Sequence, residues 1–183
     1  MANQRYVALL RGINVGGKNP VSMKALVDTF ESAGYSEVRT YIQSGNVLFC
    51  SDRDRASLED HIERTIESHF EVPIVVVVRS LRQLRSVVRS APDGFGEQPE
   101  RFHSDVVFLK APLTATGAMK VVQTRDGVDR AWPGTGVVYF ERLSAERTKS
   151  RMSKIVGTPE YARMTIRSWS TTTKLLDLLE AET

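Results

Sequence analysis

The order of strand-like and helix-like patterns in the first 78 residues constrains the fold of this 183-residue chain more than any other feature. An apolar run of the kind that forms a buried strand comes first, and residues at helical spacing follow it. Two short β-type runs, a second amphipathic stretch and a β-branched run complete the series. The predicted elements are strand 6–10, helix 23–30, strands 37–42 and 47–50, helix 52–70 and strand 74–78. This β-α-β-β-α-β order predicts an α+β, ferredoxin-like N-terminal lobe.

Turn and cap residues support these boundaries. Asn19 can cap the first helix with Pro20 at its first position, and Ser22 is an equally suitable cap, so both starts remain open. Gly34 provides a C-terminal stop for that helix. The Gln43–Asn46 turn joins the two short strands into a tight hairpin.

The second half of the chain begins after a loop at 91–101 that is rich in Pro and Gly. This loop predicts two lobes, residues 1–90 and 91–183. A short amphipathic helix at 80–90 closes the first lobe. In the second lobe the expected elements are strand 103–109, helix 112–118, strands 121–124, 128–132 and 136–140, a helix at 146–156 and a C-terminal helix at 171–182.

Composition limits the class of protein. Hydrophobic residues make up 41% and charged residues 26% of the chain, which is ordinary for a soluble globular protein. No apolar run approaches the roughly 20 residues that cross a bilayer, and the N-terminus lacks the pattern of a secretory signal. A single cysteine, Cys50, allows no internal disulfide. We therefore predict a cytoplasmic protein without a membrane partner.

Two long motifs carry a family resemblance. The first reads LLRGINVGGKNPVSMKAL and continues through VRTYIQSGNVLF, and the second is TIRSWSTTTKLLDL near the C-terminus. Together they resemble the signatures of the domain of unknown function 1697 family of bacterial proteins. Ser168 and Ser170 depart from that pattern, because asparagines are common at these two positions in the family. The resemblance implies a ferredoxin-like first lobe and a related, α/β plait-like second lobe, and it implies no established activity.

The glycine loop after the first strand matches most of a nucleotide-binding P-loop. Gly12, Gly17 and Lys18 have the required spacing, but Asn19 and Pro20 replace the Ser or Thr that binds Mg²⁺. The hairpin that follows also predicts a mostly antiparallel sheet, so a nucleotide triphosphatase is excluded. Two interpretations remain: an anion held on backbone N–H groups, or a glycine loop that serves tight packing.

Strand direction places this loop beside the Gln43–Asn46 turn, because the first and second strands both run toward the same end of the sheet. Polar side chains of both segments can then converge on one rim. The candidate ligand-binding residues of this rim site are Arg11, Asn14, Lys18, Gln43, Ser44 and Asn46. The alternative is plain turn chemistry, in which Gly and Asn accept a positive φ.

Positive charge gathers in the C-terminal part of the chain. Residues 142–174 carry eight basic and two acidic side chains, a net charge of +6, whereas residues 1–141 sum to zero. Arg167 and Lys174 flank Ser170 and Thr171, either of which can cap the last helix, and they complete our set of candidate ligand-binding residues. Trp169 either stacks on a base or anchors this helix to the core. The segment is thus either a nucleic-acid interface or a solvated basic face.

Catalytic patterns are sparse. His61 and His69 share one predicted helix without an acidic partner, His103 is isolated, and Cys50 is a small packing residue. No motif indicates a metal or a cofactor, and the sequence leaves catalytic residues, enzymatic activity and oligomeric state open. The leading functional hypothesis is a binding protein for an anionic partner, either nucleic acid or a phosphorylated ligand. The alternative is an enzyme or sensor that holds a small phosphorylated ligand between the Gly12–Asn19 loop and the Gln43–Asn46 turn.

Overall fold

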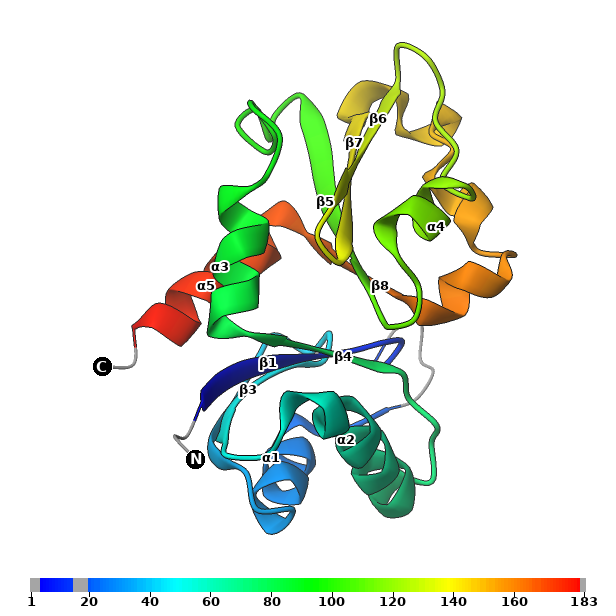
Figure 1. The fold of residues 1–183 in the computed structure, drawn as a ribbon. Coiled ribbons are helices and arrows are strands. Elements are labelled where there is room, and N and C mark those ends of the chain that lie inside the picture. Colours follow the sequence, from blue (N-terminus) through cyan, green and yellow to red (C-terminus); the bar gives the residue numbers. More distant parts are fainter. Residues whose placement is uncertain (1–3, 15–19, 182–183) are drawn as a thin grey trace. The chain divides into compact units, whose positions relative to one another are not determined.

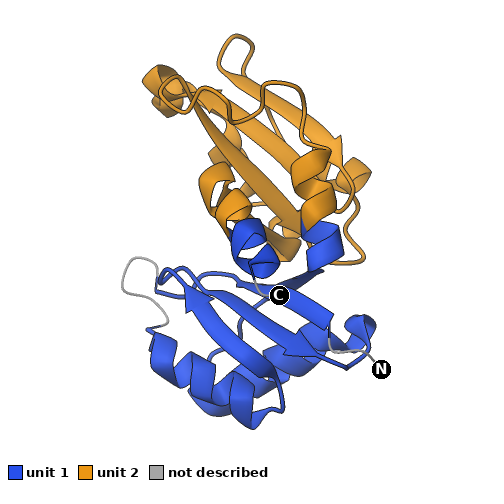
Figure 2. Cartoon of the chain, turned by 90° about the vertical axis from the view of Figure 1, so that its left-hand side faces the viewer, with its two compact units in different colours: residues 1–84, 175–183 blue, residues 85–174 orange. Residues whose placement is uncertain are grey.

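The structure is a computed structural model that describes residues 4–14 and 20–181 (Figure 1). The chain divides into two compact units, which Figure 2 shows in different colours. Unit 1 contains residues 1–84 and 175–183, and unit 2 contains residues 85–174. The predicted domain boundary between residues 90 and 91 stays a prediction, because a compact unit is not the same as a domain that folds by itself.

Unit 1 is built on a four-stranded sheet in the order β2-β3-β1-β4. Each neighbouring pair in the sheet is antiparallel. The helices α1 and α2 cover one face of the sheet (Figure 1). The elements are β1 (Gln4–Leu10), α1 (Met23–Ser32), β2 (Ser36–Tyr41), β3 (Asn46–Ser51), α2 (Arg55–Phe70) and β4 (Val76–Ser80). The predicted ferredoxin-like lobe is confirmed.

Local chemistry sets the ends of α1. Ser22 is the N-cap, and its side chain accepts a hydrogen bond from the Ala25 N–H at 3.4 Å. The other predicted cap, Asn19, lies outside the described residues. At the opposite end Ala33 closes the helix and Gly34 follows with φ 90°, the left-handed conformation that glycine adopts without steric cost.

The core of unit 1 lies between the sheet and the two helices. Strand β1 is buried on both faces from Tyr6 to Leu10, as the apolar run predicted. Tyr6, Phe30, Tyr35 and Phe49 form an aromatic cluster, in which the Tyr35 and Phe49 ring centroids are 4.9 Å apart. Edge-to-face contacts of this kind add to the stabilisation that burial provides.

Two carboxylates of α2 protect the edge strand β4. Glu63 accepts a hydrogen bond from the Val76 N–H at 2.8 Å, and Glu59 accepts one from the Val78 N–H at 2.9 Å. Unpaired N–H groups on an edge strand invite pairing with another chain. The α2 carboxylates therefore satisfy the donors that an added strand would need.

Unit 2 repeats this topology. Its sheet has the order β6-β7-β5-β8, again with antiparallel neighbours. The elements are β5 (Phe102–Leu109), α4 (Ala115–Met119), β6 (Asp129–Gly134), β7 (Val137–Leu143) and β8 (Met164–Ser168). One further helix follows the last strand of each sheet: α3 (Leu81–Arg89) follows β4, and α5 (Trp169–Glu180) follows β8. The second plait-like lobe is confirmed.

Three details of the second lobe differ from the sequence-based prediction. Residues 121–124 are not a strand; the side chains of Val121 and Val122 pack against the core without entering the sheet. The helix expected at 146–156 is instead a pair of short 3₁₀ helices, η1 (Ser144–Lys149) and η2 (Met152–Ile155), and a third, η3 (Pro159–Arg163), follows. Strand β8 was not predicted.

In the described part of the chain, none of the helices has both the length and the apolar character needed to span a membrane.

Candidate functional site

The loop after β1 and the turn before β3 meet at one end of the first sheet. Asn14 joins them, because its Nδ2 group donates to the Gln43 carbonyl at 3.1 Å and to the Val21 carbonyl at 2.9 Å. The Asn14 Oδ1 atom accepts from the Val21 N–H at 2.8 Å. The Leu10 N–H donates to the Gly45 carbonyl at 2.8 Å and ties the turn to the end of β1.

These hydrogen bonds change the chemistry expected of the rim site. Both N–H groups of the Asn14 amide are used within the chain. The buried Asn46 amide donates to the Tyr41 carbonyl and to Ser44 Oγ, each at 3.0 Å. The two asparagines therefore shape the rim and have no amide N–H left for a ligand. Lys18 lies outside the described residues.

The other predicted rim residues, Arg11, Gln43 and Ser44, lie at the surface or half-buried. A ligand site on this rim stays a prediction. The rim also holds a strained residue. Ile42 has φ 50° and is 50% exposed. A β-branched residue in the left-handed region is an uncommon conformation with a steric cost.

At the start of α5 the structure separates the two predicted cations. Arg167 is only 8% exposed and donates from Nη1 to the Ile166 carbonyl at 2.9 Å. Burial lowers the pKa of its guanidinium to about 10. Lys174 is exposed. Arg167 therefore lies in the interior, and the two cations do not form one surface.

The neighbouring residues of α5 are structural. Ser168 Oγ accepts from the Thr171 N–H at 3.2 Å, so Ser168 caps the helix in place of the expected Ser170 or Thr171. The Trp169 ring packs edge-to-face on Phe95, with centroids 5.1 Å apart. A Cβ added to Gly96 would lie 2.0 Å from Trp169, so the loop at Gly96 lies directly against the indole. This packing supports the interpretation of Trp169 as a core anchor.

Unit 2 has a groove of about 320 Å³ within the basic segment. Its apolar residues come from η2, the residue after η2 and β8, and its polar residues come from β7, η1, η2 and the link between these two 3₁₀ helices. The lining residues are Arg142, Arg147, Ser150, Met152, Ser153, Ile155, Val156 and Ile166. The groove therefore combines two guanidinium groups and two hydroxyls with an apolar floor.

A charge network that the sequence did not predict lies behind Arg142. Asp105 accepts from Arg142 at 3.2 Å and contacts His103 Nε2 at 3.1 Å. The register of β5 with β7 brings His103 opposite Arg142 and so assembles the group. Burial raises the pKa of the Asp105 carboxyl, and the attraction of His103 and Arg142 opposes that effect. Residue spacing alone gave no signal for these contacts, because they depend on strand pairing.

Exposed cations continue along this segment. Arg147, Arg151 and Lys154 are exposed, and no ion pair joins them to a carboxylate in the described part of the chain, whereas Lys149 pairs with Glu146 at 2.6 Å. Asp129 fixes the position of the segment, because its Oδ2 atom accepts from the Arg151 N–H at 2.8 Å and from the Arg125 N–H at 2.9 Å. We call Arg147, Arg151 and Lys154 the basic surface.

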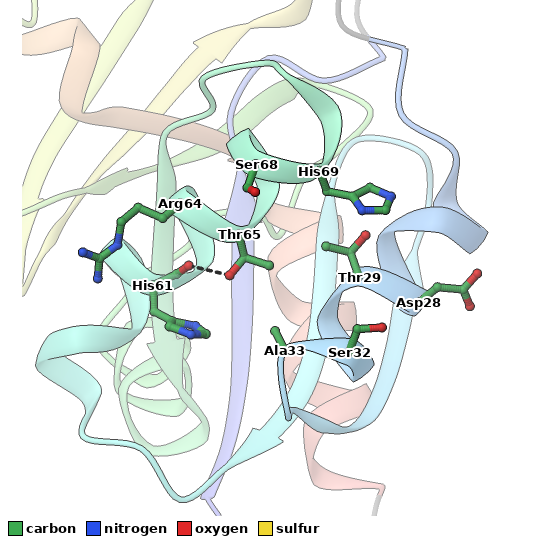
Figure 3. A pocket seen from close by; sticks show the side chains of 9 residues that line it. All are labelled: Asp28, Thr29, Ser32, Ala33, His61, Arg64, Thr65, Ser68 and His69. Atoms are coloured by element: carbon green, nitrogen blue, oxygen red, sulfur yellow. Dashed lines mark hydrogen bonds between the residues drawn. The ribbon is translucent and has the colours of Figure 1, made fainter.

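Unit 1 has a larger groove of about 550 Å³ between α1 and α2 (Figure 3). His61, Thr65 and His69 form a stripe along α2, since residues four apart lie on one face of a helix. The remaining lining residues are Asp28, Thr29, Ser32, Ala33, Arg64 and Ser68. The two histidines on one helix are visible in the sequence, whereas no sequence pattern indicates the facing wall of α1.

A buried tyrosine orients His61. The Tyr35 hydroxyl lies 2.7 Å from His61 Nδ1, and the two rings meet edge-to-face with centroids 5.7 Å apart. Burial raises the pKa of Tyr35 to about 12, so the phenol keeps its proton at neutral pH. Burial, together with the positive charges of Arg53 and Arg64, lowers the pKa of His61.

No group of three or more His, Cys, Asp or Glu side chains suited to a metal ion occurs among the described residues. Cys50 is buried, and its Sγ lies 3.3 Å from Glu37 Oε2.

The fold defines a two-unit α+β protein with two antiparallel plaits of the same strand order. Residues 3–139 match the model of a family described as "Protein of unknown function (DUF1697)". The chain therefore belongs to this family, as the motifs at Leu9–Leu26 and Val38–Phe49 predicted.

The chain is similar to the solved structure of the conserved bacterial protein SP0830 from Streptococcus pneumoniae. The two sequences are 26% identical, and the TM-score is 0.84. The match covers 97% of this chain and 99% of the other. No curated protein sequence matches this chain significantly.

Proposed function

We propose that this protein binds an anionic partner, with nucleic acid as the partner class, through the basic surface and the adjoining groove of unit 2. The observation that supports this proposal most directly is the exposure of Arg147, Arg151 and Lys154, which have no carboxylate partner among the described residues. Cations that lack an internal partner are available to neutralise phosphates, and such contacts supply most of the affinity of non-specific nucleic-acid binding.

The position of the basic surface is fixed by the fold. The Asp129 carboxylate is buried and holds the Arg151 N–H, so the junction between η1 and η2 is tied to the start of β6. A backbone held in this way loses less conformational freedom on binding than a free segment does. Beside it, Arg142 and Arg147 line the groove together with two serine hydroxyls, which are further donors to phosphate oxygens.

Fluorescence anisotropy with labelled single-stranded and duplex oligonucleotides at several salt concentrations tests the proposal. The double variant Arg151→Gln/Lys154→Gln should weaken binding and reduce the salt slope of log K by roughly two, about one for each lost phosphate contact. The matched control is Arg89→Gln/Lys120→Gln, which removes one exposed Arg and one exposed Lys elsewhere in unit 2. Absence of salt-dependent binding by the wild-type protein contradicts the proposal, and so does an equal loss in the control.

A separate variant tests the predicted role of the α5 start. Lys174→Gln removes the exposed cation without disturbing the buried Arg167. If the nucleic acid reaches this helix, the salt slope falls by roughly one. An unchanged slope restricts the interface to the basic surface.

The second candidate is an enzyme or sensor for a small phosphorylated ligand at the rim of unit 1. It is supported by the Asn14 hydrogen bonds, which bring the loop after β1 to the Gln43 carbonyl. It is weakened because the side-chain amides of Asn14 and Asn46 already donate hydrogen bonds to carbonyl groups of the chain. Thermal stabilisation by a nucleotide or a sugar phosphate that is lost in Arg11→Gln, with no response to oligonucleotides, favours this candidate.

A further inference from the structure

The α1–α2 groove has properties that the proposed function does not use. It belongs to unit 1, whereas the basic surface belongs to unit 2. Its volume of about 550 Å³ lies within the range of roughly 300–1,000 Å³ that small-molecule sites occupy. It also holds a histidine that a buried tyrosine fixes in place.

The tautomer of His61 follows from the environment of Tyr35. The Tyr35 ring is buried, and His61 Nδ1 is the acceptor within reach of its hydroxyl, at 2.7 Å. A buried hydroxyl proton without an acceptor is costly, so we assign the proton of this hydrogen bond to Tyr35. The neutral imidazole then carries its own proton on Nε2, which leaves an N–H donor in the groove.

The surroundings of His61 favour an anion. The positive charges of Arg53 and Arg64 act on the ring, and Arg64 also lines the groove. The carboxylate that lines the groove, Asp28, pairs with Lys24 at 2.7 Å. Figure 3 shows Asp28 beside Thr29 on α1, away from His61, and shows His61 at the Ala33 end of the groove. An acceptor group therefore meets donors and positive charge at the His61 end.

The length of the groove indicates more than a single ion. His61 and His69 are two helical turns apart, which is about 12 Å along α2. Thr65 lies between them, and the exposed Ser32 and Ser68 add hydroxyls from both walls (Figure 3). We propose that the α1–α2 groove binds a small molecule with a phosphate or carboxylate group, to which His61 Nε2–H donates. Arg64 acts on this group through its positive charge, since Figure 3 shows its side chain extending from α2 on the side away from α1.

Nuclear magnetic resonance of the full-length protein tests this site directly. The probes are inorganic pyrophosphate and citrate, titrated separately at constant ionic strength. The expected result is a saturable shift of the His61 imidazole resonances and of the Ala33 and Thr65 amides with one or both anions. The anion that binds more tightly identifies the chemistry of the ligand group. If neither anion gives a saturable shift at His61, the proposal is wrong.

Matched variants distinguish binding in the α1–α2 groove from general electrostatic attraction of the anion to the protein. Ser68→Trp fills the groove from an exposed position and should weaken binding by roughly tenfold or more, whereas Ala56→Trp places the same ring on α2 outside the groove and should not. Arg64→Gln should weaken binding more than Arg55→Gln, which removes the same charge from an exposed α2 residue that does not line the groove. Equal effects within either pair would overturn the proposal. Oligonucleotide binding by unit 2 should be unchanged in Ser68→Trp, so the two proposals fail independently.

Discussion

Arg79 and Arg167 occupy the same place in two different sheets and make the same hydrogen bond. Each is the fourth residue of a five-residue final strand, and each donates from Nη1 to the carbonyl of the preceding residue at 2.9 Å. Both are 8% exposed, and burial lowers the pKa of both guanidinium groups. Their partners in the sheet are Val7 of β1 and Val106 of β5.

This equivalence shows that the two units repeat one plan. Adding four to each strand number in the order β2-β3-β1-β4 gives the order β6-β7-β5-β8, so corresponding strands occupy the same places in the two sheets. In both units a helix begins directly after the final strand, at Leu81 and at Trp169. The two buried arginines therefore lie at equivalent positions, each just before the point at which the final strand of a unit ends and a helix begins.

The Asn14 side chain should be a major source of stability for the rim of unit 1. Asn14→Ala removes three hydrogen bonds and leaves a non-glycine residue at φ 53°, so we expect a loss of about 2–3 kcal/mol in the free energy of unfolding. Asn14→Asp keeps the acceptor for the Val21 N–H but sets a carboxylate oxygen against the Val21 and Gln43 carbonyl oxygens, so it should lose at least as much. Urea denaturation measures both. A stability of Asn14→Ala equal to that of the wild type would show that these hydrogen bonds contribute nothing net.

Gly45 is required at the turn for two reasons that a pair of variants can separate. Gly45 has φ 80°, and a Cβ there would lie 2.8 Å from the Ile13 side chain and 2.9 Å from Leu10 Cβ. Gly34 has φ 90° but nothing within 4 Å. We expect Gly34→Ala to cost about 1 kcal/mol from conformation alone and Gly45→Ala to cost about 2–4 kcal/mol, because Leu10 Cβ cannot move away. Similar midpoints in urea for the two variants would contradict the steric argument.

The sequence predicted the first unit well because its signals are local. The apolar run of β1, the Ser22 cap and the Gly34 stop each depend on a few adjacent residues, and the structure confirms them. The meeting of the loop after β1 with the Gln43–Asn46 turn also follows from strand direction alone. Local signals could not show that the Asn14 and Asn46 amides are used within the chain.

The second unit was harder to predict because its elements depend on distant partners. Strand β8 has only five residues, and its Met164 and Thr165 become buried by pairing with β5. The apolar pair Val121–Val122 looked like a strand, yet it packs beside α4 without a ladder. The His103–Asp105–Arg142 network and the α1–α2 groove likewise arise from pairing and packing, which residue spacing does not encode.

Ile42 should be replaceable with a gain in stability. Its φ of 50° is unfavourable for a β-branched residue, and its 50% exposure means that little apolar burial would be lost. We expect Ile42→Asn to raise the free energy of unfolding by about 1 kcal/mol, since Asn tolerates the left-handed region. Ile42→Val keeps the branch at Cβ and should give no gain, which makes it the control. A less stable Ile42→Asn protein would show that the isoleucine side chain contributes more than its strain costs.

Protonation of His61 should destabilise the protein in mildly acidic solution. Burial first, and the charges of Arg53 and Arg64 second, lower its pKa below the ordinary 6.5, so the folded state binds a proton less readily than the unfolded state does. The stability that neutral His61 contributes to the folded state is fully present above pH 6.5, and it is lost as the pH falls through the folded-state pKa of His61. His61→Gln should therefore flatten the decline of the unfolding free energy just below pH 6.5, as measured by urea denaturation at closely spaced pH values. The same slope in the wild type and in His61→Gln would show that the proton is taken up elsewhere.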